Sequence, residues 1–260
     1  MHLRYVARSD VGLGREGNED SAVAGPDVLA VADGMGGHAA GEIASQAAVA
    51  EFSRAVGAGV PAPALEQLAD LFTHANNRIR RLVAESPERE GMGTTATVIL
   101  GPVTGNGQVA LGHIGDSRAY LLRGDTLTQL TRDHTFVQTL VDDEQITPAE
   151  ARVHPARSVV TKVLQGENPT EPDLEFVHVE PGDRILVCSD GLTDVATDDD
   201  IRDVLGGGGA LDEVADRLVQ LALAGGGPDN ITIVLADVVS GDRGPGDEAA
   251  TYLVGAATPA

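Results

Sequence analysis

Apolar residues follow a helical spacing in several parts of the chain. Over 63–85 they recur three and four positions apart, which is typical of a helix with one buried face. The residues of this stripe are Leu65, Leu68, Leu71, Ala75, Ile79, Leu82 and Val83. An Ala-rich stretch without proline predicts a helix over 40–56, and a last amphipathic helix is expected over 211–223. Thr197, which three aspartates follow, predicts the start of a further helix.

Short apolar runs bounded by Gly, Asp or Asn predict strands. They cover 3–9, 28–32, 94–100, 109–114, 118–122, 126–130, 174–179, 183–188 and 231–238. Residues 133–160 are polar and mixed, with short helical stretches expected at 136–141 and 148–153. Because strands and helices come in groups and do not alternate regularly, the order predicts an α+β protein with packed sheets beneath helices. Residues 239–260 are rich in Gly, Ala and Pro and predict a flexible tail outside the core.

The charge of the chain excludes some partners. With 18 basic and 40 acidic residues, its formal net charge is −22 at pH 7, and Lys162 is the single lysine. A nucleic-acid-binding face needs clustered basic side chains, so nucleic acid is excluded as a partner. Cys188 is the one cysteine, which fits a reducing compartment. Because no signal peptide or membrane-spanning apolar stretch is seen, we expect a cytoplasmic location and no membrane insertion.

Acidic residues stand next to glycine or asparagine where predicted strands begin or end. They include Asp20, Asp33, Asp116, Asp190 and Asp229. An Asp-Gly pair by itself is a common turn, and spacing alone does not show that these strand ends meet. If they meet, a cluster of oxygen ligands would suit hard cations such as Mg²⁺ or Mn²⁺.

Six short segments carry a more specific signal. They are 15–20 (REGNED), 32–37 (ADGMGG), 91–95 (GMGTT), 115–118 (GDSR), 189–191 (SDG) and 227–230 (GPDN). In this order, over about residues 5–238, they resemble the bacterial branch of the metal-dependent protein phosphatase (PPM, type 2C) family. The similarity is greatest to actinobacterial Ser/Thr phosphatases that oppose receptor-like kinases.

The resemblance implies a fold and a metal centre. The implied fold is a four-layer α-β-β-α sandwich with two central antiparallel β-sheets flanked by helices, which we expect over residues 1–238. Two Mn²⁺ or Mg²⁺ ions would be bound by the side chains of Asp33, Asp190 and Asp229 and by the Gly34 carbonyl. A third ion would lie at Asp116 with Asp190. Residues around these ligands would support them, with Glu19 and Asp20 holding metal-bound waters and Asn230 beside them.

The resemblance also implies a reaction, the hydrolysis of phosphoserine and phosphothreonine in proteins by a metal-activated hydroxide that attacks phosphorus in line. Arg15 matches the family's phosphate-binding arginine. His38 is the candidate acid for the leaving alkoxide, since Met35 stands where eukaryotic members carry histidine. Residues 133–158 match the family's flap, where Ser158 would contact substrate or metal-bound water. A solvated arginine, a surface histidine and a plain surface loop are the alternatives for these three features.

Other phosphate chemistries do not fit the residues. A cysteine-based phosphatase needs arginine six residues after its cysteine, where this chain has Asp194, and P-loop and kinase motifs are absent from the sequence. Two alternatives stay open, namely a phosphatase of the same fold dedicated to one phosphorylated regulator and an inactive module that binds phosphoproteins.

The expected partners are phosphorylated proteins, including Ser/Thr kinases and their substrates, and we expect a monomer. Close actinobacterial relatives often continue into a transmembrane helix and an extracellular domain. The chain is therefore expected to be either a soluble relative or the catalytic part of a membrane-anchored protein.

Overall fold

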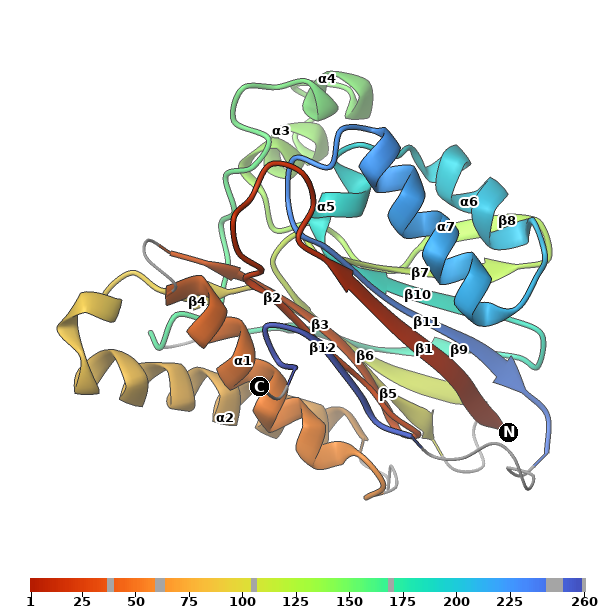
Figure 1. The fold of residues 1–260 in the computed structure, drawn as a ribbon, viewed down its shortest axis with the longest axis horizontal. Coiled ribbons are helices and arrows are strands. Elements are labelled where there is room, and N and C mark those ends of the chain that lie inside the picture. The colour runs from red at the N-terminus through yellow and green to blue at the C-terminus, as the bar shows by residue number, and fades with distance from the viewer. Residues whose placement is uncertain (37–39, 59–63, 104–106, 168–170, 242–249, 259–260) are drawn as a thin grey trace.

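Two antiparallel sheets pack face to face between two layers of helices (Figure 1). The computed structural model describes residues 1–36, 40–58, 64–103, 107–167, 171–241 and 250–258. This architecture confirms the predicted α+β fold of four layers, α-β-β-α.

The first sheet contains both the first strand of the chain and the last strand of the predicted domain. Its five strands lie in the order β1 (His2–Asp10), β11 (Ile231–Val239), β10 (Arg184–Cys188), β7 (Arg118–Arg123) and β8 (Thr126–Gln129). β1 and β11 pair along their whole length although they are far apart in the sequence. Helices α6 (Asp198–Gly206) and α7 (Leu211–Ala224) cover the outer face (Figure 1). α6 begins at the predicted cap, where the Thr197 hydroxyl accepts a hydrogen bond from the Asp200 amide.

The second sheet contains the remaining strands. Their order is β12 (Tyr252–Gly255), β2 (Asp20–Ala24), β3 (Val28–Met35), β5 (Ala96–Val103), β6 (Gln108–Ile114) and β9 (Asp173–His178), with β4 (Gly93–Thr94) paired to the end of β3. Helices α1 (Ala40–Phe52) and α2 (Ala64–Glu85) cover its outer face, and short 3₁₀ turns follow them at Ser53–Ala55 and Pro87–Arg89.

Three apolar layers hold the sheets and helices together. Between the sheets, the buried side chains include Val31, Ile99, Val187 and Val234. The two outer layers lie beneath the helices, and the predicted stripe of α2 supplies one of them with its buried residues. Each fully buried Val, Leu or Ile contributes about 1.5–3 kcal/mol relative to an exposed one. The low aromatic content is therefore compensated by many aliphatic side chains.

Two strands differ from the sequence-based expectation. β2 was not predicted, because all five of its residues are buried and they show no alternation of apolar and polar positions. The expectation of a tail outside the core is wrong for Tyr252–Gly255, which forms β12 and pairs with β2. The Tyr252 ring also packs edge-on against Tyr5, with ring centroids 6.1 Å apart. Residues 242–249 and 259–260 lie outside the described residues.

The attachment of β12 to β2 leads to a testable prediction. Gly255 has a φ of +70°, and a Cβ at this position would overlap the Asp20 carbonyl oxygen. Gly255→Ala is therefore expected to detach β12 and to lower the free energy of unfolding by about 1–3 kcal/mol. Chemical denaturation and hydrogen–deuterium exchange at 252–255 measure both effects.

Gly57→Ala is the matched control for this change. Gly57 has nearly the same φ, +71°, but a Cβ there would meet no atom within 4 Å. The control therefore carries only the backbone strain that a non-glycine residue adds in this conformation. Equal losses in both variants, with slow exchange retained at 252–255, would contradict the prediction.

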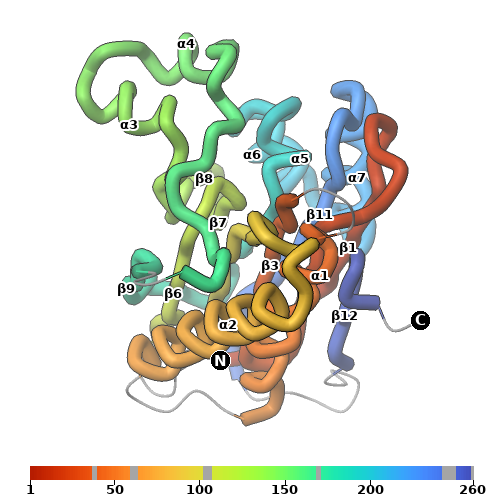
Figure 2. Tube along the Cα trace, turned by 90° about the vertical axis from the view of Figure 1, so that its left-hand side faces the viewer, coloured from red at the N-terminus to blue at the C-terminus, as the bar shows by residue number. Residues whose placement is uncertain are grey.

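A small helical element stands outside the four layers at one end of the sandwich. It contains α3 (Phe136–Asp142) and α4 (Pro148–Arg152), which lie apart from both sheets (Figure 2). The one-turn helix α5 (Asp190–Thr193) follows β10 below it. Within the described ranges, no helix has the length and apolar character needed to cross a membrane.

Candidate metal centre and active site

The acidic strand ends meet at the end of the sandwich beneath α3 and α4. Asp20 on β2 is directly opposite Asp33 on β3. Asp190 opens α5 immediately after β10, Asp229 precedes β11, and Asp116 follows β6. Because these elements belong to both sheets, the face-to-face packing brings the five carboxyl groups to a single rim. The geometry thus confirms that the predicted strand ends converge.

The electrostatics show that these carboxyl groups are close together and poorly compensated. Burial raises the pKa of Asp33 well above its ordinary value, and the charges of Asp20, Asp190 and Asp116 raise it further. Burial likewise raises the pKa of Asp20 to about 8 and that of Asp190 to about 7, and it raises the pKa of Asp116. A buried acidic cluster of this kind is stabilised when a cation neutralises it.

The donor atoms fit hard divalent cations. The Oδ1 atom of Asp190 is buried and has no hydrogen-bond partner within the described part of the chain, which leaves it available as a ligand. Over the same residues, no three His, Cys, Asp or Glu side chains form a ready-made site for one ion. Carboxylates assisted by a backbone carbonyl and by water suit Mg²⁺ and Mn²⁺, since Mg²⁺ in particular keeps several waters.

Arg15 lies at the edge of the acidic cluster. Its Nη2 atom donates to Oδ2 of Asp229 over 2.6 Å, and its side chain is half-exposed. Asn230 holds the loop that carries Arg15. Its side-chain amide donates to the carbonyls of Val11 and Gly17, and its Oδ1 accepts a 2.8 Å hydrogen bond from the Glu19 amide. Arg15 and Glu19 therefore both lie beside the Asp229–Asn230 turn.

Hydroxyl groups support the carboxylates, and sequence reasoning did not single them out. Ser189 Oγ donates to Asp20 Oδ2 over 2.7 Å and accepts from the Thr232 amide. Thr95 Oγ1 accepts from the Asp33 amide and lies 2.7 Å from Ser117 Oγ. A signal was present, because Ser189 precedes Asp190, Ser117 follows Asp116, and Thr95 belongs to the GMGTT segment.

The two Asp-Gly pairs are not turns. Gly34 continues β3 and Gly191 lies within α5, and neither has a left-handed φ. A Cβ on Gly34 would overlap the Gly41 carbonyl oxygen at the start of α1, and one on Gly191 would overlap the Asn230 carbonyl oxygen. The glycines are thus needed for close approach of neighbouring backbones beside the predicted metal ligands.

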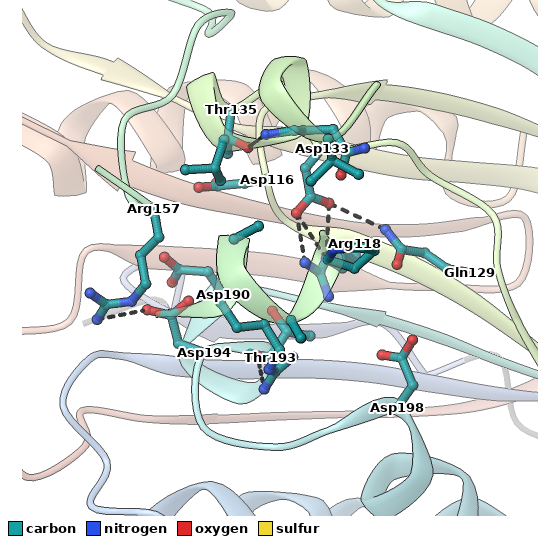
Figure 3. Close-up of a pocket in the computed structure, with 17 residues that line it drawn as sticks. Asp116, Arg118, Gln129, Asp133, Thr135, Arg157, Asp190, Thr193, Asp194 and Asp198 are labelled. Carbon is teal, nitrogen blue, oxygen red and sulfur yellow. Dashed lines mark hydrogen bonds and ion pairs between the residues drawn. The ribbon is translucent and has the colours of Figure 1, made fainter. Parts of the chain in front are cut away.

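A cavity of about 540 Å³ opens between the metal centre and the helices α3 and α4 (Figure 3). Its lining includes Asp116, Thr135, Arg157 and Asp190, and Figure 3 shows Asp116 next to Thr135 with Asp190 below them. Its position beside the acidic cluster gives a substrate access to the predicted ligands.

Two candidate residues do not belong to the described part of this centre. His38 lies outside the described residues, so its position cannot be compared with the acids. Ser158 is exposed in the turn after α4, and it is not among the residues that line the cavity. Its neighbour Arg157 lines the cavity instead and lies 3.6 Å from the Asp194 carboxylate.

Comparisons with known proteins agree with this arrangement. A family model described as protein phosphatase 2C matches residues 18–208. The serine/threonine protein phosphatase PstP of Mycobacterium tuberculosis is 50% identical over 245 residues, which are 93% of this chain and 46% of the relative. The chain therefore spans less than half the length of that relative.

Two crystal structures of the mycobacterial protein match the fold. One superposes with a TM-score of 0.88 at 49% identity and covers 92% of this chain and 100% of the solved one. The other, the catalytic domain of PstP in complex with two manganese ions, has a TM-score of 0.83 at 48% identity. It covers 92% of this chain and 99% of the solved one.

Proposed function

Because the chain belongs to the protein phosphatase 2C family, we propose that it hydrolyses phosphoserine and phosphothreonine in proteins in a reaction that requires Mn²⁺ or Mg²⁺. The observation that carries this proposal is the buried acidic cluster, to which both sheets contribute and which Arg15 at its edge compensates only in part. The manganese ions of the related catalytic domain support two divalent ions as the cofactor.

Each acidic residue has a role in this proposal. Asp33, Asp190 and Asp229, with the Gly34 carbonyl, would hold two ions, and Asp116 with Asp190 would hold a third. When bound, the ions would neutralise the acids, polarise the phosphoryl oxygens and make a water molecule more acidic. Asp20 accepts a hydrogen bond from Ser189, and it would orient water near the ligands.

Arg15 would bind the substrate phosphate. Its guanidinium group is planar and suits two phosphate oxygens at once. In the structure it lies on Asp229 at the exposed edge of the cluster, so a phosphate that enters the cavity can take over part of this contact. A local cation is needed, because the net charge of −22 repels phosphorylated substrates. The assignments of the leaving-group proton to His38 and of a substrate contact to Ser158 stay predictions from the sequence.

Removal and return of the metal test the proposed function. Protein stripped with a chelator is expected to release no phosphate from a phosphothreonine peptide, and Mn²⁺ or Mg²⁺ is expected to restore release. Because the ions bind the folded acidic cluster and not the unfolded chain, Mn²⁺ should also raise the unfolding temperature. Phosphate release that persists in excess chelator would contradict the proposal.

The same assay separates the two alternatives. A binding module would gain stability from Mn²⁺ and bind the phosphopeptide without releasing phosphate. A phosphatase dedicated to one regulator would release phosphate from that phosphorylated regulator and from none of a panel of unrelated phosphopeptides.

We extend the proposal to partners and location. The proposed partners are phosphorylated proteins, including Ser/Thr kinases and their substrates, and the proposed location is the cytoplasm, which suits the buried free thiol of Cys188. The proposed catalytic domain runs beyond residue 238, because β12 pairs with β2 and belongs to the same sheet. A monomer is expected, and sedimentation velocity would show a dimer if this is wrong.

A further inference from the structure

His134 is a buried side chain that the proposed reaction does not use. It lies at the start of the flap segment (residues 133–158), between β8 and α3, and is 3% exposed. It makes two hydrogen bonds to one residue, Gly115. The His134 amide donates to the Gly115 carbonyl over 2.7 Å, and Nδ1 accepts from the Gly115 amide over 3.1 Å. Gly115 is the residue directly before Asp116, the proposed ligand of the third ion.

The carbonyl and Nε2 of His134 bond to residues beyond the flap segment. The His134 carbonyl accepts a 2.7 Å hydrogen bond from the amide of Thr161, three residues after the segment ends. Nε2 lies 3.1 Å from Oδ2 of Asp173 on β9. Since Nδ1 accepts a hydrogen bond, Nε2 must carry the ring proton and donate a hydrogen bond to Asp173. Burial, with a contribution from Lys162, lowers the pKa of His134, which favours this neutral form.

Gly115 is restricted by the neighbouring sheet as well as by His134. Its φ is +111°, and a Cβ on it would overlap the Thr95 side chain. Thr95 in turn lies 2.7 Å from Ser117 Oγ, on the other side of Asp116. The Asp116 loop is therefore held by the sheet at Thr95 and by the flap segment at His134. Figure 3 shows Asp116 facing the cavity next to Thr135, the residue after His134.

We propose that His134 is a positioning residue whose ring holds the Gly115–Asp116 loop to the start of the flap segment and to β9, and thereby sets the place of Asp116 in the cavity. This inference rests on the proposed function only for its effect on activity. The hydrogen bonds of His134 belong to the chain itself, so their effect on the Gly115–Asp116 loop can be measured without metal.

Two conservative substitutions separate the two ring contacts. The side-chain oxygen of asparagine lies near the position of Nδ1, so His134→Asn keeps an acceptor for the Gly115 amide. The amide nitrogen of glutamine lies near the position of Nε2, so His134→Gln keeps a donor for Asp173 but no acceptor for Gly115. His134→Leu removes both contacts. Only the first of these variants preserves the side-chain contact to the Asp116 loop.

The first measurement is hydrogen–deuterium exchange of the metal-free protein. Amides at 115–117 and in the flap segment are expected to exchange about ten-fold faster in His134→Gln and His134→Leu. In His134→Asn, exchange at 115–117 should stay close to that of the wild type. If His134→Leu fails to fold, the comparison of the asparagine and glutamine variants still decides the outcome.

The second measurement is the Mn²⁺ concentration that gives half-maximal phosphate release. It should rise about ten-fold in His134→Gln and His134→Leu, in line with the usual effect of losing a residue that supports a metal ligand. His134→Asn should restore it, and the KM for the phosphopeptide at saturating Mn²⁺ should change little in all three variants.

His113 provides the matched control. It is 1% exposed and its ring stacks on His134, with centroids 4.9 Å apart, but it bonds to the Arg132 carbonyl and to Thr97 Oγ1, which itself donates to the Ser117 carbonyl. His113→Leu leaves the Thr97–Ser117 and His134–Gly115 hydrogen bonds possible. It should therefore lower the unfolding temperature about as much as His134→Leu, with a much smaller change in exchange at 115–117 and in Mn²⁺ dependence.

Two outcomes would overturn the inference. One is wild-type exchange at 115–117 in His134→Gln, and the other is the same change in exchange and Mn²⁺ dependence in the His113 and His134 leucine variants. A wild-type protein that releases no phosphate at any Mn²⁺ concentration would instead overturn the proposed function. The exchange experiment would still test whether His134 holds the Gly115–Asp116 loop.

Discussion

Replacement of Asp33 by asparagine is expected to reduce metal-dependent phosphate release about a thousand-fold. Asp33 interacts electrostatically with all four of the other clustered aspartates. Asparagine has nearly the same shape, and the backbone bonds of residue 33 to Thr94 and Thr95 stay possible. The fold should therefore persist while the central ligand charge is lost.

The unfolding temperature distinguishes this loss from damage to the fold. The metal-free Asp33→Asn variant should be at least as stable as the metal-free wild type, because one charge has left a buried acidic cluster. Mn²⁺ should raise its unfolding temperature much less than that of the wild type.

Asp125→Asn serves as the control for Asp33→Asn, because Asp125 is exposed in the β7–β8 hairpin. It should keep wild-type release and the full stabilisation by Mn²⁺. An Asp33→Asn variant that retains more than about a tenth of the wild-type release would refute the central role of Asp33.

Gly191→Ala is expected to impair both stability and activity. The added Cβ would overlap the Asn230 carbonyl oxygen, so the Asp190 helix and the Asp229–Asn230 turn must move apart. Overpacking of this kind costs about 3 kcal/mol, which lowers the unfolding temperature by roughly 6–12 °C in a domain of this size. Because the separation acts on two metal ligands, phosphate release well below the unfolding temperature should fall about a hundred-fold.

Gly206→Ala is the matched control for the second prediction. Gly206 ends α6 with an ordinary φ, and a Cβ there would meet no atom within 4 Å. Alanine favours the helix over glycine by about 0.5–1 kcal/mol, so this variant should be as stable as the wild type or slightly more stable. Wild-type stability and activity in Gly191→Ala would show that the close approach at Gly191 is not required.

Local patterns predicted the regular elements well. The apolar stripe of 63–85 became α2 at Ala64–Glu85, and the cap at Thr197 starts α6. Such signals are local, because helix periodicity and capping depend on residues three or four positions apart. The proposed metal-binding aspartates were also named in advance, but only through the order of six motifs that resemble a known family.

The sequence by itself determined the fold class, the helices other than the one-turn α5, most strands and the set of acidic candidates. The tertiary structure decided which of those acids meet, and it placed β2 and β12, whose short segments have no periodic signal. It also decided that the glycines of the two Asp-Gly pairs allow backbones to approach and do not form turns. The physical reason is distance along the chain, since Gly17 and Asn230 bond across 213 positions. Contacts of that kind arise only when strands far apart in the sequence, such as β1 and β11, pair and pack, and no local pattern of residues encodes them.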